Sequence, residues 1–202
     1  MNHPRPSAST LAAIFACQGK LLTAAALPRG EWIEYEERLP GYAINQLLLV
    51  FDDNTSLLLW SEQVDYGPEP WHEGFVMAAE SIGAHPEPLN RRHSGANQGF
   101  EIAPPLQAVF AGHRLACIET FVRASDIYPS NADDYLPSDS LRAKVGEHVV
   151  EFATEGSDVL PLTLVLRSPG FPPFTTKPTG KRELLSHQRV HLERPSTPRG
   201  DA

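Results

Sequence analysis

The sequence contains three groups of side chains that could do chemistry, and none has the spacing of an established catalytic motif. The first combines His72 and Glu73 with His85 and His93. Imidazole and carboxylate groups are ligands for zinc or iron. In the helix expected around Glu73, however, adjacent side chains point about 100° apart, and the other two histidines fall in a polar segment. This pattern favours exposed loop histidines over a metal site.

The second group is the pair His187 and His191, four residues apart near the C-terminus. On a helix, residues at this spacing share a face and could bind one ion. Glu183 lies one turn earlier, but no third ligand is evident and the surrounding tail is basic. A solvated tail is therefore favoured, and we expect no metal and no cofactor.

The third group consists of carboxylates in a short stretch of chain. Paired carboxylates can exchange protons or bind divalent ions, and in a strand Glu34 and Glu36 would share one face. An active site also needs a pocket that perturbs its groups, whereas Asp52 and Asp53 are typical turn residues. We expect a partner-binding surface or solvated strand faces rather than catalysis. The members of this group are Glu31, Glu34, Glu36, Glu37, Asp52 and Asp53.

Composition narrows the class of protein further. No phosphate-binding loop, dinucleotide fingerprint or nucleophile elbow is present, and the two cysteines lack metal-ligand spacing. The 202 residues include 17 Lys and Arg against 25 Asp and Glu, a net charge of −8 that disfavours nucleic-acid binding. No apolar run approaches the roughly 20 residues of a membrane helix. We expect a cytoplasmic protein that is not an enzyme and binds neither nucleic acid nor membrane.

Most of the negative charge lies in residues 31–87, which we call the acidic segment. It contains twelve acidic residues and one basic residue, Arg38, so its net charge is −11. All three tryptophans of the chain, Trp32, Trp60 and Trp71, also fall in it. Concentrated charge speeds the encounter with an oppositely charged partner, and aromatic anchors are typical of interfaces. The pattern predicts a surface for a basic protein.

The favoured function is a non-enzymatic protein that occludes a basic partner, as a bacterial immunity protein would occlude a nuclease toxin. Its carboxylates would imitate the phosphates that the toxin's Lys and Arg side chains normally hold. One alternative is a small-molecule or metal-dependent hydrolase that uses His72, Glu73 and His85. Another is an assembly subunit that pairs through an exposed strand around Pro161. The expected partner-binding residues are Glu31, Trp32, Glu34, Glu36, Glu37, Asp65, Trp71 and Glu73.

Two segments that would position these residues resemble each other. Residues 11–16 and 106–111 are identical at four of six positions, and a fifth position exchanges Ile for Val. Each segment leads through a glycine into an apolar strand candidate and later reaches a hairpin candidate whose turn residues suit tight turns. The shared order predicts two copies of a helix–strand–hairpin unit. The strand candidates cover 20–27 and 113–122, and the hairpins cover 46–60 and 148–166.

The remaining elements follow from local signals. Ser9 or Thr10 could cap the first helix, and Pro104 and Pro105 suit the first turn of the second. Apolar residues at 3–4 spacing predict a third helix over 69–82. We expect an α+β fold of two pseudo-repeated halves, with largely antiparallel sheet and short packing helices in one compact body. The expected parts are 1–83 (first half and following helix), 84–103 (polar linker), 104–167 (second half) and 168–202 (Pro-rich basic tail, with a helical turn or two near 182–191).

The N-terminal sequence Ile14-Phe15-Ala16-Cys17 superficially resembles a lipoprotein cleavage site. Its apolar stretch of six residues is shorter than the roughly 7–15 residues of a signal core. The same pattern also recurs at 106–111, where it cannot be a signal. We therefore expect a structural helix, with Cys17 and Cys117 as small buried residues; a disulfide between them stays open.

Overall fold

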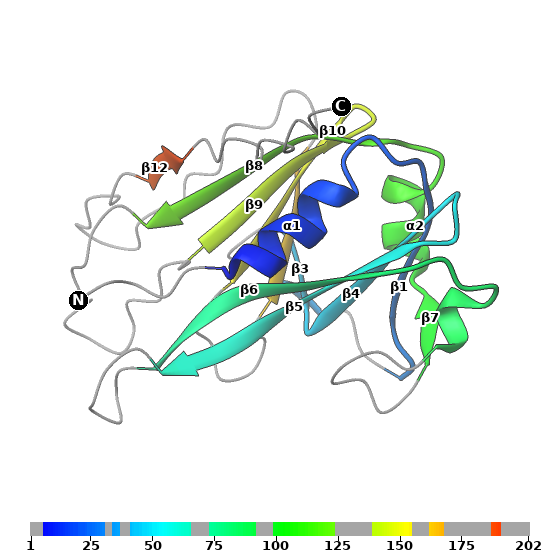
Figure 1. Cartoon of the computed structure of the whole chain (residues 1–202), viewed down its shortest axis with the longest axis horizontal. Coiled ribbons are helices and arrows are strands. Elements are labelled where there is room, and N and C mark those ends of the chain that lie inside the picture. Colours follow the sequence, from blue (N-terminus) through cyan, green and yellow to red (C-terminus); the bar gives the residue numbers. More distant parts are fainter. Residues whose placement is uncertain are drawn as a thin grey trace, which may run out of the picture.

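The described part of the chain forms a mixed α+β structure of two antiparallel sheets and two short α-helices, shown in the computed structural model of Figure 1. This confirms the expected α+β class with largely antiparallel sheet and short helices. No helix in the described part of the chain is long and apolar enough to cross a membrane. The structure describes residues 6–30, 34–36, 41–65, 73–91, 99–123, 139–154, 162–167 and 187–190.

The first sheet has five strands in the order β6-β5-β4-β1-β7. Its centre is the expected hairpin, in which Gln46 pairs with Trp60 and Val50 with Ser56. Asn54 in the turn has a φ of 59°, a left-handed conformation that asparagine tolerates well. The strands are β1 (Leu22–Pro28), β4 (Gln46–Phe51), β5 (Ser56–Asp65), β6 (Glu73–Ile82) and β7 (Phe100–Ile102).

The second sheet has seven strands in the order β12-β8-β9-β10-β11-β3-β2. The expected second hairpin is present as β10 and β11, which pair antiparallel. Pro161, around which the assembly alternative placed an exposed strand, lies outside the described residues; β11 begins after it at Leu162 and lies between β10 and β3. The strands are β2 (Glu34–Glu36), β3 (Gly41–Ile44), β8 (Leu115–Arg123), β9 (Asp139–Val145), β10 (His148–Thr154), β11 (Leu162–Arg167) and β12 (His187–Val190).

Both expected short helices are present. Helix α1 (Ala8–Ala16) is capped by Ser7 rather than by Ser9 or Thr10, because the Ser7 hydroxyl accepts the N–H of Thr10 at 3.0 Å. Thr10 itself is buried inside the first turn. Helix α2 (Pro104–Phe110) carries prolines in its first turn, as predicted. Helix α1 packs against β6, and α2 packs against β1.

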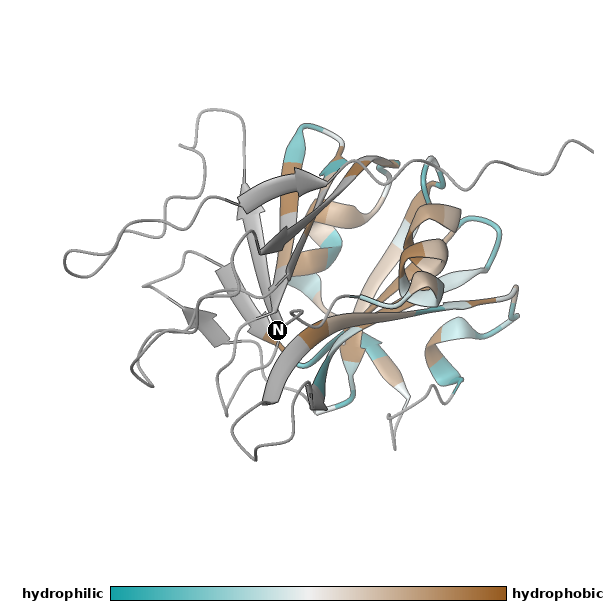
Figure 2. Cartoon of the chain, turned by 60° about the vertical axis from the view of Figure 1, so that its left-hand side comes forward, coloured by the Kyte–Doolittle hydropathy of each residue, from teal (hydrophilic) through white to brown (hydrophobic). Residues whose placement is uncertain are grey.

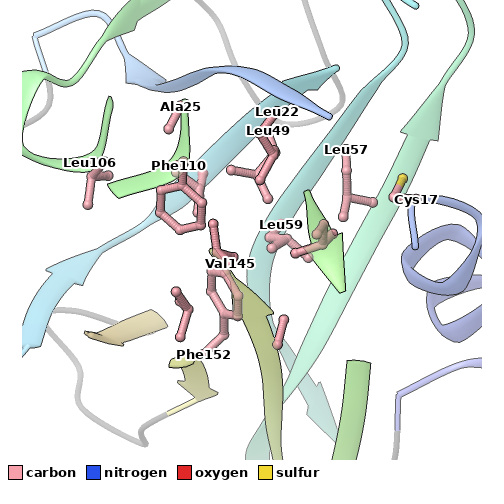
Figure 3. Close-up of a cluster of buried hydrophobic side chains, with 14 of the residues drawn as sticks. Cys17, Leu22, Ala25, Leu49, Leu57, Leu59, Leu106, Phe110, Val145 and Phe152 are labelled. Carbon is pink, nitrogen blue, oxygen red and sulfur yellow. The ribbon is translucent and has the colours of Figure 1, made fainter. Parts of the chain in front are cut away.

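One large apolar core joins the helices to both sheets. Ile14 of α1, Leu49 of β4, Phe110 of α2 and Phe152 of β10 all belong to it, and each is at most 1% exposed. The rings of Phe110 and Phe152 stack with centroids 6.4 Å apart. Figure 3 shows side chains from the two helices and both sheets filling this shared space.

A second, smaller core covers the opposite face of the five-stranded sheet. Leu48 and Val50 alternate along β4 with the residues of the large core, so they point away from it. Phe100 of β7 packs against them, as does Leu89 of the 3-10 helix η1 (Pro88–Asn90). The expected polar linker over 84–103 therefore contributes a strand, a helical turn and two apolar side chains. Figure 2 shows the apolar residues gathered along strands and helices, with polar residues in the turns.

Two helical expectations were wrong. Residues 73–82 form β6, which pairs with β5 without interruption from Asp65↔Glu73 to Ser56↔Ile82. The predicted 3–4 spacing arose because both faces of this strand are covered: Val76, Met77 and Ala78 are consecutive and all buried. In the tail, His187–Val190 forms the strand β12 against β8 instead of a helical turn.

Reciprocal main-chain hydrogen bonds join the segment before β1 to the segment before β8. The N–H of Gly19 donates to the carbonyl of Leu115 at 2.6 Å, and the N–H of Gly112 donates to that of Leu22 at 2.8 Å. Both glycines have positive φ, 88° and 81°. This junction ties the start of β1 to the start of β8. Its other pairings join Leu22 to His113, Leu115 to Lys20, and Leu21 to Arg114.

Candidate functional site

The residues expected to bind a partner divide into those that the structure places and those outside the described residues. Glu34 and Glu36 occupy alternate positions of β2, and Asp65 and Glu73 end β5 and begin β6. The structure brings the last two together as register partners. The residues outside the described part are Glu31, Trp32, Glu37 and Trp71.

The strand that carries Glu34 and Glu36 lies at one end of the seven-stranded sheet. There Glu34 pairs with Ala43 and Glu36 pairs with Gly41. The strand that was expected to carry both acids is therefore present. An edge strand places both positions where a partner can approach without displacing a neighbouring strand.

Asp65 and Glu73 form the last pair of the β5–β6 ladder. Like charges at directly opposed positions of an antiparallel pair are destabilising. A cation from another molecule would relieve this cost. This pairing could not be predicted from the sequence, because residues 69–82 were expected to form a helix.

The carboxylates of the acidic segment with described side chains are largely without cationic partners. Asp52 and Glu62 are exposed and Glu80 is half-buried, and none of the three forms an ion pair with another residue whose side chain the structure describes. Asp53 contacts Lys20, 2.9 Å from its Nζ atom, in the one salt bridge among the described residues. Hydrogen bonds from Thr55 and Lys20 lower the pKa of Asp53 to about 2. The field of the other carboxylates is thus available to a partner.

Three unpartnered oxygens lie on the outer face of the five-stranded sheet. Gln46 Oε1, Ser56 Oγ and Glu80 Oε2 are buried without a hydrogen-bond partner. Their positions share one face, because Gln46 is opposite Trp60, and Glu80 is opposite Leu58. Sequence reasoning missed Glu80. The pattern that could have indicated it is an acidic residue two positions after the apolar Ala78, on the same face of the strand.

Of the metal site expected from His72, Glu73 and His85, the structure separates Glu73 from His85. Glu73 begins β6 and His85 follows its other end, so about 30 Å of extended strand separates them. The Nδ1 atom of His85 accepts the N–H of Glu87 at 3.1 Å. His72 and His93 lie outside the described residues. Among the residues that are described, no group of three or more His, Cys, Asp or Glu could hold a metal ion.

The C-terminal histidine pair also loses its expected geometry. His187 begins β12, where it pairs with Arg123, and His191 lies outside the described residues. In a strand, residues four positions apart share a face but lie about 13 Å apart, too far to ligate one ion, whereas one turn of a helix brings them together. The reason for expecting a shared ion is therefore gone.

Cys17 has the properties of a structural residue. It is buried and free, so it forms no disulfide with Cys117. Burial raises the pKa of its thiol to about 11, against the lowering effects of the Lys20 charge and the Ser81 hydroxyl. A thiol that stays protonated is a poor nucleophile. The expectation of a small buried cysteine is confirmed at this position.

Comparison with known proteins adds no assignment to this surface. No family model, curated protein or solved structure matches the chain. Function must therefore be inferred from the residues and their arrangement.

Proposed function

We propose that this chain is a non-enzymatic protein that occludes a basic protein partner through its acidic segment, in the manner of a bacterial immunity-type inhibitor. The observation that carries the proposal is unneutralised charge. The net charge over residues 31–87 is −11, and among the carboxylates of this segment whose side chains the structure describes, Asp53 alone has a cationic partner. Such a field attracts a basic surface and speeds association with it.

The placement of the acids on strands supports a steric mechanism. Glu34 and Glu36 belong to an edge strand, and Asp65 and Glu73 belong to the ends of two paired strands. Strand backbones are already ordered, so less conformational entropy is lost on binding. A partner whose basic site is held against these carboxylates cannot bind phosphates at that site. Occlusion then follows from contact alone and needs no catalytic group.

We infer that the fold arose by duplication of a helix followed by a four-stranded meander. The first copy is α1-β1-β4-β5-β6, and the second is α2-β8-β9-β10-β11. In each copy a glycine with positive φ follows the helix, and the first strand has a register shift near its start. The excess acidic charge belongs to the first copy, since the charges balance outside residues 31–87 and the +3 tail over 177–202. We therefore expect one partner molecule per chain.

The test begins with capture of partners on the tagged full chain, washed at low and high salt, and continues with association kinetics on the recovered protein. Glu34→Lys and Glu36→Lys should each slow association several-fold at low salt, and together by about tenfold or more. The difference should shrink at high salt, because screening weakens exposed charge pairs. Glu147→Lys is the matched control, since Glu147 is exposed and lies outside the acidic segment. An unchanged association rate in the double variant would exclude the proposed surface.

A further inference from the structure

We propose that the open edge of β6 binds an extended basic segment of the partner as an added strand. This inference rests on the proposed function and specifies how the partner docks. In strand addition, main-chain hydrogen bonds supply affinity, and alternate side chains supply specificity. The relevant features are the edges of the two sheets and the side chains beside them.

The sheet edges differ greatly in length. Strands β2 and β7 have three residues each and β12 has four, whereas β6 has ten. Short edge strands are one way in which proteins prevent unwanted pairing. In contrast, β6 pairs with β5 over ten consecutive positions without a bulge, and it contains neither proline nor lysine. It therefore lacks the usual protection of a long edge.

Helix α1 covers a face of β6 rather than taking the place of a neighbouring strand. Met77 belongs to the large core with Ile14 and Cys17, and Ala79 packs against the same core. These alternate positions face inward, toward α1. Within the described part of the chain, β6 has one strand neighbour, β5. On the side away from β5, the main-chain groups of β6 have no strand partner among the described residues, and alternate groups would face an added strand.

The side chains of β6 indicate the charge of the occupant. Glu80 carries a buried oxygen, Oε2, that lacks a hydrogen-bond donor. Glu73 is directly opposite Asp65, so two acidic residues share this end of the β5–β6 ladder. A residue opposite Glu80 in an added strand would have its Cβ about 5 Å away. Lysine or arginine at that position would supply the missing donor.

A second copy of this chain fits the edge poorly. The residues Glu73–Ile82 include two acids and no basic residue. Two β6 strands side by side would therefore bring no cationic side chain to Glu80 and would add like charges. A segment that alternates basic and β-branched residues satisfies both the edge and the carboxylates.

The experiment uses the full chain and two synthetic peptides. The probe is an acetylated, amidated ten-residue peptide that alternates Lys with Val, and its control alternates Glu with Val. Amide hydrogen exchange is followed residue by residue by NMR. We expect alternate amides of β6 to exchange about tenfold more slowly with the Lys peptide and to stay unchanged with the Glu peptide.

Variants test the contribution of the side chain. Glu80→Gln removes the charge but keeps an acceptor, and it should weaken Lys-peptide binding several-fold, since a charge-assisted hydrogen bond becomes a neutral one. Glu147→Gln removes the same charge at an exposed position away from β6 and should leave binding unchanged. Circular dichroism of both variants checks that they fold.

Three results would overturn the inference: β6 amides that stay unprotected at saturating Lys peptide, equal protection by the Glu peptide, or protection that rises with protein concentration alone. If a captured partner associates in a charge-dependent way while β6 stays unprotected, the proposed function stands and this docking mode fails. If no partner is captured and Glu34→Lys with Glu36→Lys changes no association, the proposed function itself fails.

Discussion

Gln107 links α2 to the main chain of β1, and its removal should destabilise the protein by about 2 kcal/mol. Its Oε1 accepts the N–H of Ala25 at 2.9 Å, and its Nε2 donates to the carbonyl of Thr23 at 3.0 Å. Strand β7 pairs with β1 only from Ala26 onward. The Gln107 amide therefore takes the place of a strand neighbour at this point.

The magnitude follows from the burial of the two main-chain groups. Ala25 is fully buried, so loss of its acceptor leaves an unsatisfied N–H, which costs about 1–3 kcal/mol. Thr23 is exposed, and its carbonyl can bind water instead, so that bond contributes at the low end of about 0.5–1.5 kcal/mol. For a chain of this size, the combined loss corresponds to a fall in Tm of about 4–8 °C.

Urea denaturation followed by circular dichroism measures this loss in Gln107→Ala. Gln107→Glu keeps an acceptor for Ala25 but loses the donor to Thr23, so it should fall between the wild type and the alanine variant. Gln18→Ala is the matched control, because Gln18 is exposed. Exchange of the Ala25 amide should also accelerate in Gln107→Ala. If Gln107→Ala and Gln18→Ala differ by less than about 0.5 kcal/mol, water replaces the side chain at no net cost and the reasoning is wrong.

Three further predictions concern single contacts. Gly146 has a φ of 58°, and an added Cβ would lie 2.5 Å from the His113 ring, so Gly146→Ala should cost about 1–3 kcal/mol in thermal unfolding. The pKa of Asp53 is lowered from 3.8 to about 2 in the folded state, so its contribution to stability is present above pH 4 and is lost as the pH falls from 4 to 2. Asp53→Asn should remove that part of the pH dependence of unfolding. If the variant and the wild type lose stability identically between pH 4 and 2, the lowered pKa of Asp53 is contradicted. The Cys17 thiol, with its pKa raised from 9.0 to about 11, should resist a thiol reagent at pH 8 in the folded protein and react readily in urea, and stability should fall as the pH rises from 9 to 11.

The parts of the fold that sequence predicted best are those fixed by local chemistry. The β4–β5 hairpin was predicted from the turn residues 52–55, whose side chains bond their own backbone: the Asp53 carboxylate accepts the N–H of Thr55 at 3.0 Å. The prolines at the start of α2 were equally informative, since a missing N–H costs nothing in the first turn of a helix. Both signals act within a few residues and do not depend on distant partners.

Strand β6 could not be predicted because its conformation depends on β5 and on coverage of both its faces. The consecutive buried residues Val76, Met77 and Ala78 remove the alternation by which a half-exposed strand is recognised. The candidate site also has a part that local sequence predicts and a part that depends on distant strands. The strand with Glu34 and Glu36 could be predicted from its alternation, whereas the pairing of Asp65 with Glu73 requires the register of two strands.

The large core also constrains how the chain folds during its synthesis. Ile14 and Phe152 belong to one buried cluster, and the hydrogen bonds between Gly19 and Leu115 cannot form until the second half exists. At about 5–20 residues per second, the ribosome needs roughly 5–20 s to add the residues between Trp60 and Phe152. During that time the inner face of the first sheet, with Leu49 exposed to water, has no permanent cover. We therefore expect the nascent first half to depend on chaperones, and truncation before α2 to yield an aggregating fragment.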